Sequence, residues 1–190
     1  MRIAIPGLFF FLLLGSIYFS LERVLYSDTS YILFQVINTD SLQPQVHRYG
    51  SFITQCFPLL AAKLNLPLSW IVVVYSASFN LFYLGVAAIL ILKLKEYSLA
   101  LLMSLYFTLF VSDTFYWPTN EIHQAIAWMF LLFGLTIYFF RKNTSRFISI
   151  PVLSALAFLS IYTHPLTLFP IAFLWLFFCL ENVNNISKIQ

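Results

Sequence analysis

The side chains that could move protons are confined to a few polar segments of an otherwise apolar sequence. All three histidines and five of the seven acidic residues fall in the segments 22–67, 112–123 and 162–165. These residues are Glu22, Asp28, Asp40, His47, Asp113, Glu121, His123 and His164. Carboxylates and imidazoles are common general acids and bases in catalysis. The three segments are therefore where a catalytic site is expected, although any single acid in them also suits a solvated loop.

The second segment, SDTFYWPTNEIH at 112–123, combines acids with aromatic rings. If a helix begins near Asn120, Glu121 lies in its first turn, where the helix dipole favours an anion. Trp117 suits stacking against a sugar ring or a lipid headgroup, and it equally suits the aromatic belt of a membrane interface. Glu121 and His123 are two residues apart and do not share a helix face, which argues against a zinc protease.

The elements that must position these residues follow from the composition. Of the 190 residues, 61% are hydrophobic and only 9% are charged, whereas about 25% are charged in a typical soluble domain. This scarcity of charge excludes a soluble globule, and the abundance of apolar residues excludes a disordered chain. The net charge of +3 is small and its bases are scattered, so nucleic-acid binding is not expected. A polytopic membrane protein remains.

A helix needs about 20 mainly apolar residues to cross a bilayer. Six stretches meet or nearly meet this length: 3–21, 68–92, 97–112, 121–140, 147–162 and 166–180. The sequence therefore predicts one all-α transmembrane domain over residues 1–190, with a long outer loop at 22–67. Within this loop, 29–38 and 51–64 suit helices lying in the membrane interface, and Pro58 predicts that the second is kinked or begins anew. The Thr-His-Pro before the last span favours a tight turn over a proton-carrying His164.

The distribution of Lys and Arg sets the orientation, because cytoplasmic loops carry an excess of these residues. With both termini in the cytoplasm, seven of the ten bases lie inside, and the acids and histidines described above lie outside. Cys56 then falls outside and Cys179 near the inner end of the last span, which excludes a disulfide between them. We expect the inner (plasma) membrane of a bacterium.

This layout resembles the N-terminal module of GT-C-type glycosyltransferases. The resemblance rests on LERVLYSDTSYILFQVI after the first span, on QVHRYGSFITQCFPLLAAKL and on DTFYWPTNEIH. It implies inverting transfer of a sugar from a polyprenyl-phosphate donor at the outer face, with membrane lipids around the chain. Members of this superfamily usually have several hundred residues and more spans, so the resemblance also implies a partner subunit or a further C-terminal region.

The resemblance assigns roles to seven residues. Asp28 is the expected catalytic base, and Asp40 is the second choice. Arg48 with His47 would hold the phosphate, because an arginine can bind it through two N–H groups. Substrate binding would be completed by Glu121, His123 and Trp117. No cofactor is predicted, and a divalent metal stays open.

The leading alternative is a non-enzymatic membrane subunit, either a scaffold or a transporter component. A transporter is expected to carry charged or broken helices near the membrane midplane, often in repeated halves. Few polar or helix-breaking residues lie near the predicted midplane, among them Asn80, Gly85 and Gly134. All three also suit helix packing. The chain shows no internal repeat, and its spans contain no Ser-His or paired-acid motif for an intramembrane hydrolase.

Overall fold

The computed structural model describes residues 4–44, 48–110, 115–118 and 121–186, and the regular elements in these ranges are helical. They are α1 (Ala4–Tyr18), α2 (Ser20–Val24), α3 (Ser27–Thr39), the 3-10 turn η2 (Tyr49–Ser51), α4 (Phe52–Lys63), α5 (Leu68–Ala88), the π-helical η3 (Ile89–Leu94), α6 (Tyr97–Leu109), α8 (Glu121–Arg141), α9 (Arg146–Thr163), the 3-10 turn η4 (Pro165–Thr167) and α10 (Leu168–Ile186). The all-α prediction is confirmed for these residues.

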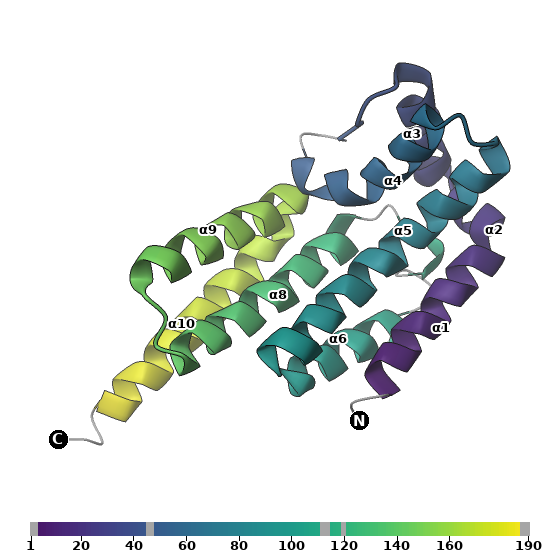
Figure 1. Ribbon diagram of the computed structural model, residues 1–190. Coiled ribbons are helices and arrows are strands. Elements are labelled where there is room, and N and C mark those ends of the chain that lie inside the picture. The colour runs from purple at the N-terminus through teal and green to yellow at the C-terminus, as the bar shows by residue number, and fades with distance from the viewer. Residues whose placement is uncertain (1–3, 45–47, 111–114, 119–120, 187–190) are drawn as a thin grey trace.

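The long helices lie side by side in a bundle (Figure 1). α8 packs against α9 on one side and α5 on the other, and α1 and α6 cover α5. Aromatic residues fill the centre, where the Tyr83 and Phe107 rings stack with centroids 4.0 Å apart and Phe9 of α1 lies 6.0 Å from Phe107. Figure 1 places α3 and α4 at the upper end of the bundle, which we call the polar end.

Three helices are long and apolar enough to cross a membrane, namely Leu68–Leu94, Glu121–Arg141 and Arg146–Thr163. A helix of 21 residues, such as α8, is about 30 Å long, which matches the hydrocarbon core. Large apolar side chains also point outward, since Phe147 is 93% exposed and Phe11 is 74% exposed. Such a surface is typical of a protein embedded in lipid rather than dissolved in water.

The predicted element boundaries need three adjustments. The stretch predicted as one span at 3–21 is divided, because α1 ends at Tyr18 and α2 begins at Ser20. α6 ends at Leu109, and residues 111–112 of the predicted third span lie outside the described residues. α4 runs through Pro58, so the alternative of a new helix beginning there is wrong. The proline removes one N–H, whereas packing of α4 on α5 holds the rest of the helix.

The orientation of α4 determines what the polar end contains. Its polar residues Thr54 and Gln55 are buried against the bundle, whereas the apolar residues Phe57, Leu60 and Leu64 are exposed. This arrangement is opposite to that of a helix on a soluble protein, and it suits a helix whose outer face meets lipid. The consequence is a set of polar side chains enclosed between α4 and the ends of α5 and α8.

Candidate functional site

An ion pair between residues far apart in the sequence lies at the polar end. Arg48 Nη1 donates to Glu121 Oε2 at 2.7 Å, across 73 positions of the chain. Glu121 is the first residue of α8, where the unpaired N–H groups of a helix attract negative charge. Its side chain is 8% exposed, while that of Arg48 is 31% exposed. The carboxylate is therefore buried, whereas the arginine side chain is partly exposed.

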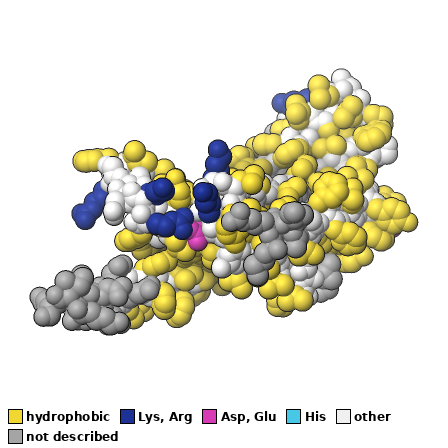
Figure 2. Space-filling view, turned by 60° about the horizontal axis from the view of Figure 1, so that its bottom comes forward, with side chains coloured by type: hydrophobic (Ala, Val, Ile, Leu, Met, Phe, Trp, Pro, Cys, Tyr) yellow, Lys and Arg dark blue, Asp and Glu magenta, His cyan; other side chains and the backbone are white. Residues whose placement is uncertain are grey.

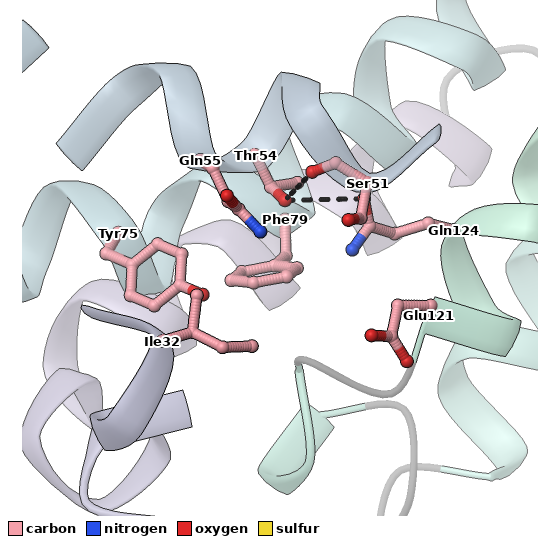
Figure 3. Close-up of a pocket in the computed structure, with 8 residues that line it drawn as sticks. All are labelled: Ile32, Ser51, Thr54, Gln55, Tyr75, Phe79, Glu121 and Gln124. Carbon is pink, nitrogen blue, oxygen red and sulfur yellow. Dashed lines mark hydrogen bonds between the residues drawn. The ribbon is translucent and has the colours of Figure 1, made fainter. Parts of the chain in front are cut away.

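A narrow pocket lies beside Glu121 (Figure 3). It is lined by Ile32, Ser51, Thr54, Gln55, Tyr75, Phe79, Glu121 and Gln124. Thr54 Oγ1 lies 3.1 Å from the Ser51 carbonyl oxygen and 3.3 Å from Gln124 Oε1, and its one hydroxyl proton can be donated to either; the contact with Gln124 links α4 to α8. The free volume is about 10 Å³, enough for roughly one water molecule. In this conformation the pocket can hold a water but not a sugar.

Gly50 places the Arg48 segment directly on the end of α9. A Cβ atom at position 50 would overlap Oγ1 of Thr163 and would lie 2.8 Å from the Leu159 carbonyl oxygen. Only glycine allows this approach of the two backbones. Ser51 Oγ donates to the Arg48 carbonyl at 3.0 Å, so the segment is fixed on both sides of Gly50. Arg48 is thereby held within reach of Glu121.

His164 belongs to the same end of the molecule. It caps η4, where its Nδ1 accepts the Leu166 N–H at 3.3 Å, so the predicted tight turn is confirmed. Partial burial lowers the pKa of His164, the positive charge of Arg48 lowers it further, and Glu121 acts in the opposite direction. The imidazole is therefore neutral at pH 7 and close enough to the ion pair to respond to its charges.

Trp117 and the predicted base Asp28 lie on two neighbouring segments. The Trp117 ring contacts Tyr26, with centroids 5.4 Å apart. Asp28 follows two residues later in the first turn of α3 and is exposed. The aromatic contact therefore brings the beginning of α3 beside the segment that leads to Glu121. Within the described residues, no hydrogen bond or ion pair joins Asp28 to the Arg48–Glu121 pair.

The remaining predicted site residues, Asp40, His47 and His123, do not lie in one common environment. Asp40 is exposed after α3 in a left-handed conformation with φ of 50°, and His47 lies outside the described residues. His123 is buried, and its Nδ1 is 2.8 Å from the hydroxyl oxygen of Tyr106 on α6. Glu121 and His123 thus face different neighbours, as their spacing predicts.

Arg23 is a polar anchor that the sequence did not single out. It is fully buried, and it donates through Nε to Ser76 Oγ at 2.8 Å and through Nη1 to the Phe115 carbonyl. Its guanidinium also lies 4.2 Å from the centre of the Phe115 ring. Burial lowers the pKa of Arg23 to about 10, so it stays charged at neutral pH. Arg23 ties α2 and α5 to the segment preceding α8.

The chain matches no protein-family model, no curated protein and no solved structure. Its function must therefore be argued from the site. Among the residues described, no group of three or more His, Cys, Asp or Glu side chains is placed to hold a metal ion. The chemistry available at the polar end is that of carboxylates, one partly exposed arginine, a neutral imidazole and aromatic rings.

Sequence reasoning missed the amides and hydroxyls around Glu121. Gln124 is 2% exposed and Gln55 is 3% exposed, and Gln55 exchanges two hydrogen bonds with the backbone of Gln43, at 2.8 and 3.1 Å. The available signal was the spacing of Gln124, three residues after Glu121 and therefore on the same helix face. The inward direction of Thr54 and Gln55 had no signal, because it depends on how α4 packs against α5 and α8.

Proposed function

We propose that the chain is an integral membrane protein of the GT-C type, with six spans and with α3 and α4 in the membrane interface. Helices α1, α6 and α10 lie alongside the three long helices (Figure 1), which supports counting them as spans although they are shorter. The proposed reaction is transfer of a sugar from a polyprenyl-phosphate donor at the polar end, taken as the outer face of a bacterial inner membrane.

In the proposed reaction Asp28 takes the proton of the acceptor hydroxyl as its oxygen attacks the anomeric carbon. The bond from that carbon to the phosphate oxygen breaks, and the polyprenyl phosphate leaves with the electron pair. Arg48 stabilises the leaving phosphate, because its exposed N–H groups are not all engaged by Glu121. His47 would add a donor to the phosphate, and Asp40 is the alternative base.

One observation carries this proposal. The contact between Tyr26 and Trp117 brings an exposed carboxylate, two aromatic rings and the segment of the Arg48–Glu121 pair to one end of the bundle. Aromatic rings suit the faces of a sugar, and the carboxylate and the arginine suit its reacting oxygen atoms. Glu121 would act as the positioning residue for Arg48.

The test uses the full chain in lipid nanodiscs with undecaprenyl phosphate linked to radiolabelled hexoses, and membrane extract as the source of acceptors. Release of undecaprenyl phosphate and transfer of label are measured together. We expect Asp28→Asn to abolish transfer but to leave the binding of undecaprenyl phosphate unchanged. We expect Arg48→Gln to weaken the binding of undecaprenyl phosphate but not that of undecaprenol, which lacks the phosphate. Glu22→Gln, at an exposed acid on α2 that has no role in the proposed reaction, is the matched control, and loss of transfer in Asp40→Asn alone would assign the base to Asp40. Unchanged transfer by a normally expressed Asp28→Asn variant would overturn the assignment.

A second candidate function is that of a non-enzymatic membrane subunit. The observation in its favour is that Glu121 already neutralises Arg48 beside a pocket with room for one water. In that case the polar groups fix helix ends and bind no donor. The binding of the two lipids distinguishes the two candidates. A scaffold binds undecaprenyl phosphate and undecaprenol equally, both as wild type and as Arg48→Gln, whereas the transferase prefers undecaprenyl phosphate and loses this preference in Arg48→Gln.

A further inference from the structure

The end of the bundle opposite to the polar end carries a dense group of bases (Figure 2). They come from the ends of three different helices: Lys93 and Lys95 at the end of η3, Arg141 and Lys142 at the end of α8, and Arg146 at the beginning of α9. Glu96 is the one acid among the side chains described at this end. We call this surface the basic end; its described side chains, five bases and one acid, carry a net charge of +4.

The bases do not all have the same role. Arg141 is fixed, since its Nη1 is 2.9 Å from Glu96 Oε1 and its Nη2 donates to the Leu94 carbonyl at 2.8 Å. Lys93, Lys95 and Lys142 are exposed, and none forms an ion pair with any residue in the described ranges. Arg141 therefore has a structural role at this site, and the three lysines are available to a ligand.

These side chains enclose a concave surface rather than a flat one. A pocket of about 320 Å³ is lined by Lys93, Leu94, Lys95, Tyr138, Arg141 and Lys142. Insertion into a membrane requires positive charge near helix ends, but it does not require four bases around one pocket. The arrangement has the charge and the size for a phosphate group held by several ammonium donors.

The surface next to this pocket is apolar. Leu92 is 73% exposed and Phe140 is 56% exposed, and both lie within one residue of the bases on their helices. A ligand that complements the whole region therefore has an anionic head and apolar chains. We propose that the basic end binds the phosphodiester headgroup of an anionic phospholipid, with its acyl chains along the exposed side chains of η3 and α8. This inference is independent of the transferase proposal.

The test compares two phospholipids with the same acyl chains. Purified full-length protein in detergent is titrated with phosphatidylglycerol or phosphatidylcholine, and the bound lipid is counted by native mass spectrometry. Each lysine near a headgroup contributes about one kcal/mol to binding, so the triple variant Lys93→Gln, Lys95→Gln and Lys142→Gln should lose roughly 100-fold in affinity for phosphatidylglycerol. Its affinity for phosphatidylcholine should not change.

Matched variants keep the result interpretable. Lys63→Gln, at the polar end, should leave phosphatidylglycerol binding unchanged, and the triple lysine-to-arginine variant should retain it. Thermal unfolding of each variant checks that the bundle is intact. Equal affinity of the wild type for the two lipids would overturn the proposal, as would an unaltered preference in the triple glutamine variant. Displacement of the lipid by millimolar inorganic phosphate would show that the site takes free phosphate instead.

Discussion

Glu121 is a buried carboxylate whose partner, Arg48, comes from the segment just before η2. A buried charge that loses its partner costs more than the pair itself contributes, because its desolvation is no longer compensated. We expect Arg48→Gln to lower the free energy of unfolding by about 1–3 kcal/mol, the range for a charged group left without its hydrogen bond. Thermal unfolding in detergent, followed by circular dichroism, measures this change.

The control for this prediction is the double variant. Arg48→Gln combined with Glu121→Gln removes the unpaired charge, so it should be more stable than Arg48→Gln alone. Arg146→Gln, at an exposed position on α9, should change the stability by no more than about 0.5 kcal/mol. Additive effects of the two single changes would mean that the ion pair contributes nothing to folding.

The pKa of His164 predicts how stability depends on pH. Because burial and Arg48 lower this pKa in the folded protein, the unfolded chain binds the proton more readily. The contribution of neutral His164 is complete above its unfolded pKa of about 6.5 and decreases as the pH falls below that value. We expect the melting temperature to fall between pH 7.5 and 5.5 more in the wild type than in His164→Asn.

Asparagine is the suitable replacement because its side-chain oxygen can still accept the Leu166 N–H at the start of η4. His47 and His123 are present in both proteins, so the difference between the two curves isolates His164. Parallel curves for the two proteins would contradict the prediction.

At the scale of elements, the contact between η2 and α9 decides where Arg48 lies. Gly50→Ala places a methyl group against Thr163 and the Leu159 carbonyl, so η2 must move away from α9. We expect a loss of about 1–3 kcal/mol in the free energy of unfolding, the usual cost of overpacking. Gly85→Ala is the matched control, since nothing lies within 4 Å of its added Cβ, and alanine is favoured over glycine within a helix.

Gly50→Ala should also weaken the coupling between Arg48 and Glu121. A double-mutant cycle repeated in the Gly50→Ala background should give a smaller interaction energy than in the wild type. The same stability for Gly50→Ala and Gly85→Ala would show that the approach of η2 to α9 is not tight in solution.

The elements themselves were largely predictable, whereas their contacts were not. Long apolar runs predicted α5, α8 and α9, because a stretch of that length and hydropathy has few other stable conformations in lipid. The partner of Glu121 could not be predicted, since 73 residues separate it from Arg48 and only tertiary packing, of η2 on α8 and α9, brings the two together. The burial of Arg23 was equally hidden, because its acceptors include backbone carbonyls that any residue type provides.

At the scale of the whole molecule, the two ends differ in chemistry. The polar end contains the described acids Glu22, Asp28, Asp40 and Glu121 together with the bases Arg23, Arg48 and Lys63, whereas the described side chains of the basic end are five bases and one acid, Glu96. Both ends of α8 show this polarity, since it begins with Glu121 and ends with Arg141. Such asymmetry along the axis of the bundle is what the positive-inside rule produces in a chain with one fixed orientation.

This asymmetry predicts which end meets each side of the membrane. In a Cys56→Ser, Cys179→Ser background, Lys63→Cys and Ser145→Cys each place one thiol at an exposed position, the first at the end of α4 and the second just before α9. With the basic end in the cytoplasm, a membrane-impermeant maleimide should label Lys63→Cys in intact bacterial cells. It should label Ser145→Cys only after the membrane is permeabilised. Labelling of both thiols in intact cells would mean that no bilayer separates the two ends, and the reverse pattern would place the proposed transfer site in the cytoplasm.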